Sequence, residues 1–102
     1  MSRSATAGLA YKDLRDTIAQ GNSSKLDDNE IVYPLPLPPH LGDYPHSGIP
    51  KNWPRPHLTR GALKKMSAAL AALICSEYGL QTGGELRLRR NRIAHYLGLP
   101  AI

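Results

Sequence analysis

The chain has 102 residues, a length that suits one small domain with a modest hydrophobic core. It contains no run of about 18 apolar residues, and its first residues lack the long apolar region of a secretory signal, so we expect a cytoplasmic protein without membrane contact. Cys75 is the only cysteine, which excludes an internal disulfide and fits a reducing compartment.

The formal net charge is +5, and the excess is concentrated in the C-terminal part. Residues 1–30 contain four basic and five acidic side chains, whereas residues 59–102 contain seven basic and two acidic ones. Such asymmetry indicates a polyanionic or acidic partner for the second region. A basic face also keeps a small protein soluble, and composition alone does not separate the two interpretations.

The first predicted element is a helix over residues 4–20. An apolar stripe recurs there at three- or four-residue spacing and consists of Ala7, Tyr11, Leu14 and Ile18. Gly21 is placed to end the helix. The polar run 22–29 predicts a hinge between this helix and the next segment, so residues 1–30 form an N-terminal helix and polar hinge.

Residues 31–58 are predicted to form an extended strap, because eight of the nine prolines lie between positions 34 and 56. Three leucines of this strap are expected to lie on the protein itself or on a partner, namely Leu35, Leu37 and Leu41. Trp53 in the following loop must bury its ring, either as a plug in the protein's own core or as an anchor in a partner's groove.

The strongest helical pattern runs from Arg60 to Tyr78, with Thr59 as N-cap and Gly79 as the left-handed residue that ends it. Its apolar stripe consists of Leu63, Met66, Leu70, Leu73, Ile74 and Tyr78. Alanines between these positions leave the middle of the helix thin, which favours close approach of a second helix.

Two interpretations remain open for residues 82–88. Thr82 and Glu85 have capping-box spacing, whereas residues 85–89 alternate between charged and apolar in the manner of a short strand. We favour an extended piece through Leu88, then a helix over residues 90–97 and a turn. The expected fold is mainly α: one small three-helix domain with a long Pro-rich extended loop and a helix-turn-helix-like C-terminal unit at residues 59–102.

In a helix-turn-helix, a small residue faces the partner helix and a residue that tolerates positive φ makes the turn, and Ala94 and Gly98 fill these places. The stretch ALAALICSEYGLQTGGELRLRRNRIAHYLGLP, within residues 62–100, resembles the C-terminal DNA-binding region of Crp/Fnr-type transcriptional regulators. In that family a recognition helix follows the turn. Here only Ala101 and Ile102 remain, so the resemblance implies a unit truncated before its base-contacting residues.

Several basic side chains could contact nucleic-acid phosphates without reading the base sequence, or could contact an acidic protein surface. These side chains are Arg87, Arg89, Arg90, Arg92, Lys64 and Lys65. We therefore predict a non-enzymatic regulator, of transcription by the family resemblance, that acts on DNA or on a nucleic-acid-processing complex. A homodimer would suit such a regulator. The alternative is an interaction protein, such as an inhibitor encoded by a virus or mobile element or an accessory subunit of a large assembly, anchored by Trp53 and the proline strap.

Metal and catalytic chemistry find little support in the residue pattern. The candidate zinc ligands do not occur in pairs with the C-x-x-C or H-x-x-x-H spacing. These candidates are His40, His46, His57 and Cys75. No Gly-rich phosphate loop, G-x-S-x-G elbow or H-E-x-x-H motif occurs. We expect no metal, no cofactor and no catalytic residue.

Overall fold

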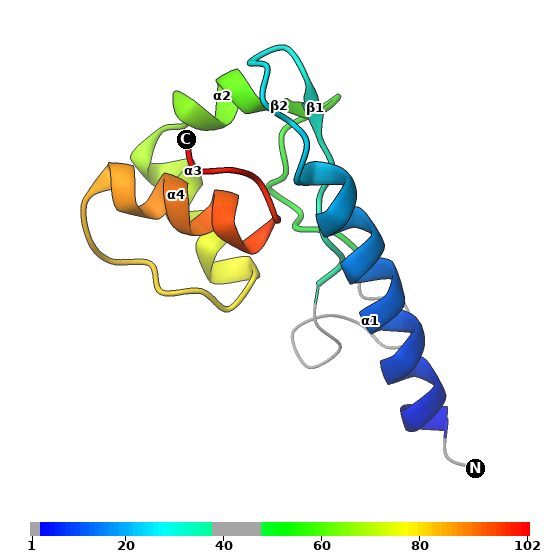
Figure 1. Cartoon of the computed structure of the whole chain (residues 1–102). Helices are drawn as coiled ribbons and strands as arrows, with labels where there is room; N and C mark the ends of the chain where they lie inside the picture. Colours follow the sequence, from blue (N-terminus) through cyan, green and yellow to red (C-terminus); the bar gives the residue numbers. More distant parts are fainter. Residues whose placement is uncertain (1–2, 38–47) are drawn as a thin grey trace.

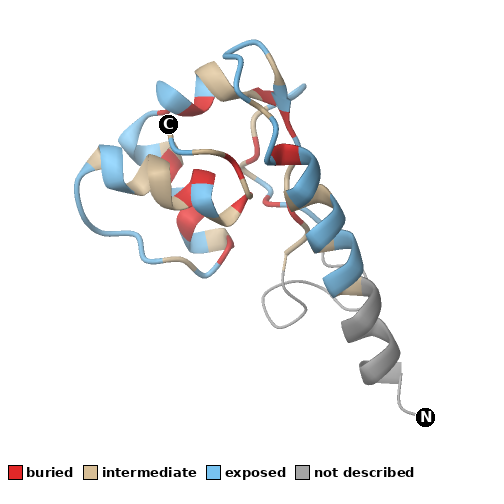
Figure 2. Cartoon of the chain, in the orientation of Figure 1, coloured by how far each residue is buried: buried red, intermediate tan, exposed pale blue. Residues whose placement is uncertain are grey.

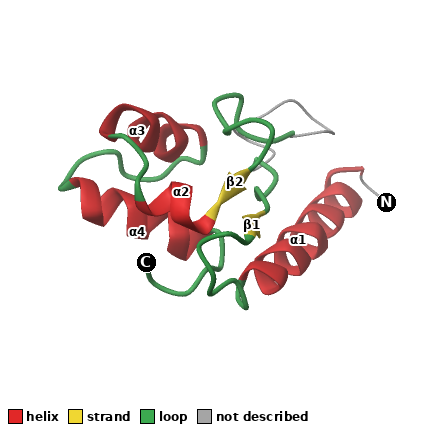
Figure 3. Ribbon diagram, turned by 90° about the horizontal axis from the view of Figure 1, so that it is seen from above, coloured by secondary structure: helices red, strands yellow, loops and turns green. Residues whose placement is uncertain are grey.

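The computed structural model describes residues 3–37 and 48–102, with the side chains of the first helix included from residue 11 onward. In chain order its elements are α1 (Arg3–Asn22), β1 (Ile31–Val32), β2 (Leu58–Thr59), α2 (Arg60–Lys64), α3 (Ala68–Glu77) and α4 (Leu86–Tyr96). Helices α2, α3 and α4 lie on one side of the short sheet and α1 on the other (Figure 3). The predicted mainly helical class is confirmed.

Helix α1 extends away from the rest of the molecule and meets it near its C-terminal end (Figure 1). The predicted apolar stripe is only partly correct, because Ile18 packs on the core while Leu14 is 52% exposed; the side chain of Ala7 lies outside the described residues. Gly21 does not end the helix, which continues to Asn22. The predicted hinge is wrong at this end, because the Asn22 side chain is fully buried and bonded to two other segments.

Strands β1 and β2 join the segment after α1 to the second half of the chain. They pair antiparallel, with Ile31 opposite Thr59 and Val32 opposite Leu58. Val32 and Leu58 are buried, whereas Ile31 faces outward, as expected for a short strand with one face on the core. This pairing places Val32 and Leu58 in the same hydrophobic core as the C-terminal helices.

The helix predicted over residues 60–78 is divided into α2 and α3, which turns three expected helices into four. Thr59 caps α2 as predicted, its hydroxyl accepting from Ala62 N at 3.1 Å. The break comes at Ser67, whose hydroxyl caps α3 by accepting from Leu70 N at 3.2 Å. A serine side chain competes well with helical backbone bonds, so a cap here replaces continuation of the helix.

Two glycines end helices by the same backbone device. Gly79 has φ 73°, and the amide of the next residue, Leu80, donates to the Cys75 carbonyl at 2.7 Å. Gly98 has φ 85°, and the residue after it bonds back to the Ala94 carbonyl at 2.9 Å. Both are Schellman motifs, which require a residue that adopts the left-handed conformation. The predicted stop at Gly79 and turn at Gly98 are confirmed.

Helix α4 begins at Leu86, so the predicted extended piece through Leu88 and the helix start at Arg90 are both wrong. Its N-cap residue is Glu85, which makes no side-chain cap bond, and the capping box expected from Thr82 is not formed. Leu86 is partly buried and packs on the core while Leu88 is 48% exposed, which matches a helical period. Helical packing overrides the alternating pattern of the sequence here.

The core lies between the sheet, α3 and α4 (Figure 2). Most of the stripe predicted for residues 60–78 is buried or partly buried, but Leu73 points outward and is 47% exposed. No described helix is long and apolar enough to cross a membrane. The buried hydrophobic residues are Val32, Leu35, Trp53, Leu58, Leu63, Met66, Ala71, Ile74, Cys75, Tyr78, Ile93, Ala94, Leu97 and Leu99.

Candidate functional site

Three of the four arginines proposed as contact residues are held by backbone carbonyls. Arg89 donates to the carbonyls of Gly84 at 3.0 Å and Ala68 at 3.4 Å. Arg90 donates twice to the Met66 carbonyl, through Nε at 2.8 Å and through a terminal nitrogen. The guanidinium groups therefore brace the α2–α3 junction and the loop before α4, a role that the sequence did not indicate.

Arg92 and Arg87 complete this group on α4. Arg92 donates to the carbonyls of Gln81 and Gly83, and so closes the same loop from its other end. Arg87 is exposed, and no described side-chain bond holds it. Arg87 and Arg90 are three positions apart on one face of α4, and Arg89 and Arg92 are three positions apart on another. We call Lys65, Arg87, Arg89, Arg90 and Arg92 together the cationic surface.

The charges of this surface are not neutralised within the described part of the chain. A carbonyl oxygen accepts a hydrogen bond but carries no formal charge, so each arginine keeps its positive charge while losing freedom of movement. The ion pairs among the described residues join other side chains, namely Arg15 to Asp16, Lys25 to Glu30, and Asp28 to both Arg60 and Lys64. Arg89, Arg90 and Arg92 are therefore charged and fixed in position, whereas Arg87 and Lys65 are charged and exposed.

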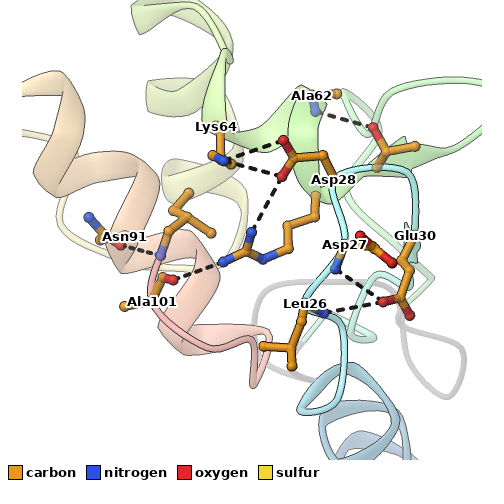
Figure 4. Close-up of polar contacts among 11 residues, drawn as sticks. Leu26, Asp27, Asp28, Glu30, Ala62, Lys64, Asn91 and Ala101 are labelled. Atoms are coloured by element: carbon orange, nitrogen blue, oxygen red, sulfur yellow. Dashed lines mark hydrogen bonds and ion pairs between the residues drawn. The ribbon is translucent and has the colours of Figure 1, made fainter.

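The two lysines predicted as contacts differ from each other. Lys64 donates to both carboxylate oxygens of Asp28, at 3.2 and 3.4 Å, and its charge is thereby paired (Figure 4). Lys65 is exposed at the end of α2, next to the Met66 carbonyl that Arg90 binds. Because Lys64 is held at Asp28, a carboxylate that it shares with Arg60, we leave it out of the cationic surface, and its predicted contact stays a prediction.

Asp28 is a structural centre that the sequence did not reveal (Figure 4). Its backbone carbonyl accepts from Gly61 N at 2.9 Å, and its carboxylate lies 3.4 Å from Arg60 as well as beside Lys64. Arg60 in turn donates to the Ala101 carbonyl at 3.0 Å. The turn after α1, the start of α2 and the end of the described chain are thus joined at one point. Because Asp28 and Lys64 are 36 positions apart, no local pattern could have paired them.

Asn22 is the second structural residue that sequence reasoning missed. Its side-chain amide donates to the carbonyls of Tyr33 at 2.9 Å and Leu97 at 3.0 Å, and its oxygen accepts from Tyr33 N at 3.1 Å. The side chain has no exposed surface. A buried asparagine that satisfies backbone groups from two other segments fixes the end of α1 against the strap and α4.

The residues proposed as partner anchors belong to the protein's own core. Leu35 has no exposed surface, Trp53 is 6% exposed and Leu37 is partly buried against the core; Leu41 lies outside the described residues. The hydroxyl of Tyr78 donates to the Leu35 carbonyl at 2.7 Å and so fastens this segment to α3. The plug interpretation of Trp53 is correct, and these side chains present too little surface to anchor a partner.

A group of tyrosines joins α1 to the C-terminal ends of α3 and α4. The ring centres of Tyr78 and Tyr96 are 4.8 Å apart, and the Arg15 guanidinium lies 5.5 Å from the centre of the Tyr96 ring. Burial is the main cause that raises the pKa of Tyr11 to about 12, and the interaction with Tyr96 adds to this effect. Burial also raises the pKa of Tyr78, and the interaction with Tyr96 again adds to the effect. The neutral phenol is the form that suits this apolar contact.

Metal binding finds no support in the described residues. No group of three or more His, Cys, Asp or Glu side chains gathers there in a way that could hold a metal ion. Cys75 is fully buried and His57 is exposed, while His40 and His46 lie outside the described residues. Burial raises the pKa of the Cys75 thiol, and the positive charge of Arg92 opposes this effect.

The residues that resemble a helix-turn-helix pack against α1. A side-chain carbon added at Gly98 would lie 2.5 Å from the Ala19 carbonyl oxygen, so this glycine allows the end of α1 to approach the turn. Ala94 is fully buried in the core. Residues 99–102 form neither helix nor strand. In this structure Gly98 serves the contact with the end of α1, and Ala94 serves the hydrophobic core.

Comparison of the chain with protein-family models, curated proteins and solved structures gave no match. The resemblance to Crp/Fnr-type regulators therefore stays a prediction. The function has to be argued from the cationic surface itself.

Proposed function

We propose that this protein is a non-enzymatic regulator that binds DNA, alone or within a nucleic-acid-processing complex, through the cationic surface. The observation that carries the proposal is that three arginines of α4 are fixed by carbonyls while no described carboxylate pairs with them. Fixed cations lose little side-chain entropy when they meet phosphates. The expected binding follows the phosphate backbone and not the base sequence.

The resemblance of residues 62–100 to a DNA-binding region supports the same proposal. With it we propose that the C-terminal unit is related to a helix-turn-helix, while the Pro-rich loop before it is proposed from the prolines of residues 31–58. Within the described residues no helix follows Gly98, so base-specific contacts in the major groove have no element there to carry them. We therefore expect DNA affinity that depends strongly on salt and weakly on sequence.

The test uses the two members of the surface that brace nothing. Lys65→Glu combined with Arg87→Glu removes two contacts and leaves the guanidinium bonds of the other arginines in place. Fluorescence anisotropy with a short labelled DNA duplex should show binding about tenfold weaker or more. The slope of log affinity against log salt should become shallower by about two, since each phosphate contact contributes about 0.9.

The matched control makes the same change in net charge elsewhere. Lys12→Glu combined with Lys51→Glu alters two exposed lysines on α1 and in the loop before β2. This control should bind DNA nearly as well as the wild-type chain. Equal losses in both variants would show that binding follows net charge alone, and no measurable binding to duplex DNA at low salt would refute the proposal outright.

A further inference from the structure

Helix α3 is apolar on nearly its whole circumference, although one side of it faces outward. Its sequence is AALAALICSE, with Glu77 as the only charged residue, and that carboxylate accepts from the Asn52 side chain. A helix that is hydrophobic all round is normally buried. Here Ala69, Leu73 and Ser76 are exposed and Ala72 is half-buried.

The exposed residues share one face by helical geometry. Positions 69, 72, 73 and 76 are three or four apart, which puts them along one stripe of a helix about 15 Å long. The alanine side chains are short, so Leu73, which is 47% exposed, projects beyond its neighbours in the middle of the stripe. The shape suits a second helix, whose side chains would pack beside Leu73 and over the alanines.

Arginine charges border this face on the side of α4. Arg89 reaches the Ala68 carbonyl at the start of α3, and Arg92 binds the carbonyls of Gln81 and Gly83 in the loop that follows the end of α3. Ala68 is itself exposed and lies four positions before Ala72, at the edge of the exposed stripe. The two guanidinium groups keep their charge, because carbonyls and not carboxylates hold them.

We propose that the exposed face of α3 binds an amphipathic helix of a partner protein, with its apolar stripe on Leu73 and the alanines and its acidic side chains toward Arg89 and Arg92. The binding goes beyond the proposed DNA contact, because it needs the apolar face of α3. A second copy of this chain is a poorer occupant, because it would bring another surface of the same positive sign to this place. One short helix face buries little area, so micromolar affinity is expected.

The probe is a displayed library of helical peptides of about five turns. Leucines stand at the apolar positions of each peptide, and the remaining positions are randomised among Glu, Lys, Gln and Ala. Selection on the wild-type chain should enrich glutamate on the flanks of the leucine stripe. Enrichment of lysine, or no enrichment over the starting library, would overturn the proposal.

An enriched peptide is then measured by fluorescence anisotropy against two variants with matched exposure. Leu73→Glu should weaken binding at least about tenfold, because it puts a carboxylate in the apolar contact and opposite the acidic flanks. Leu14→Glu alters a leucine on α1 that is 52% exposed, and it should leave binding unchanged. Equal binding by Leu73→Glu, or equal loss in both variants, would contradict the assignment to α3.

Two further measurements separate this proposal from the others. Leu73→Glu should lower DNA affinity only about as far as its added negative charge predicts, while Lys65→Glu with Arg87→Glu should still bind the peptide. Sedimentation of the wild-type chain should show a monomer. A dimer that Leu73→Glu converts to a monomer would identify a second copy as the occupant and overturn the acidic-helix assignment.

Discussion

Replacement of Asn22 by alanine tests the claim that one buried amide holds α1 to the rest of the fold. The substitution removes three hydrogen bonds, two donated to the carbonyls of Tyr33 and Leu97 and one accepted from Tyr33 N. The backbone groups left behind are buried or partly buried, so water replaces their partner poorly.

The expected cost follows from those three bonds. At a net value of about 1 kcal/mol for each, Asn22→Ala should lower the free energy of unfolding by about 3 kcal/mol. A small domain has only about 5 to 15 kcal/mol in total. For a domain of this size the loss corresponds to a fall in melting temperature of roughly 12 to 24 °C. Circular dichroism during thermal and urea unfolding measures both quantities.

The control is Asn29→Ala, an exposed asparagine in the turn after α1. It should change the free energy of unfolding by less than about 0.5 kcal/mol. If Asn22→Ala also costs less than about 1 kcal/mol, the side chain does not fix α1, and the correction of the predicted hinge would have to be withdrawn.

Two further predictions concern a glycine and the tyrosine group. Gly98→Ala should lower the free energy of unfolding by more than about 2 kcal/mol in urea, because φ is 85° there and the added carbon would meet Ala19. Gly83→Ala is the control and should be nearly neutral, because the space around Gly83 is open. Similar effects of the two substitutions would refute the close approach. Stability should be constant up to about pH 10 and fall as the pH rises toward 12, because burial raises the pKa of Tyr11 to about 12 and also raises the pKa of Tyr78, so the folded state favours the neutral phenols. Urea unfolding of Tyr11→Phe should show a smaller alkaline loss than the wild type, and an unchanged pH profile would contradict the burial of this phenol.

Local signals in the sequence were sufficient for several helix ends. Thr59, Gly79 and Gly98 act through residues within a few positions of themselves, and each performs the predicted role. The break at Ser67 depends partly on the rest of the fold, because Arg90 from another helix binds the carbonyl just before it. A continuous apolar pattern alone therefore overestimated the length of the middle helix.

Contacts between distant segments were beyond the reach of sequence pattern. Composition showed that the basic side chains gather in the C-terminal part, but it did not show that Lys64 binds the carboxylate of Asp28. Leu35 and Trp53 were correctly identified as side chains that must be covered, but only the tertiary arrangement decides that their own core covers them. Residue type thus indicated the environment that each side chain requires, and the fold decided which neighbour supplies it.

Our proposal couples stability and binding in α4, because Arg89, Arg90 and Arg92 brace the fold and are also proposed contacts. A guanidinium group presents several donors in one plane, so Arg90 can bind the Met66 carbonyl through two nitrogens and still face outward with its charge intact. A lysine at that position would keep the charge but lose the paired donors, so it would retain attraction for an anion while loosening the α2–α3 junction. The carbonyl bonds of Arg89, Arg90 and Arg92 thus give a structural reason for arginine at three positions of α4, which net charge alone does not impose.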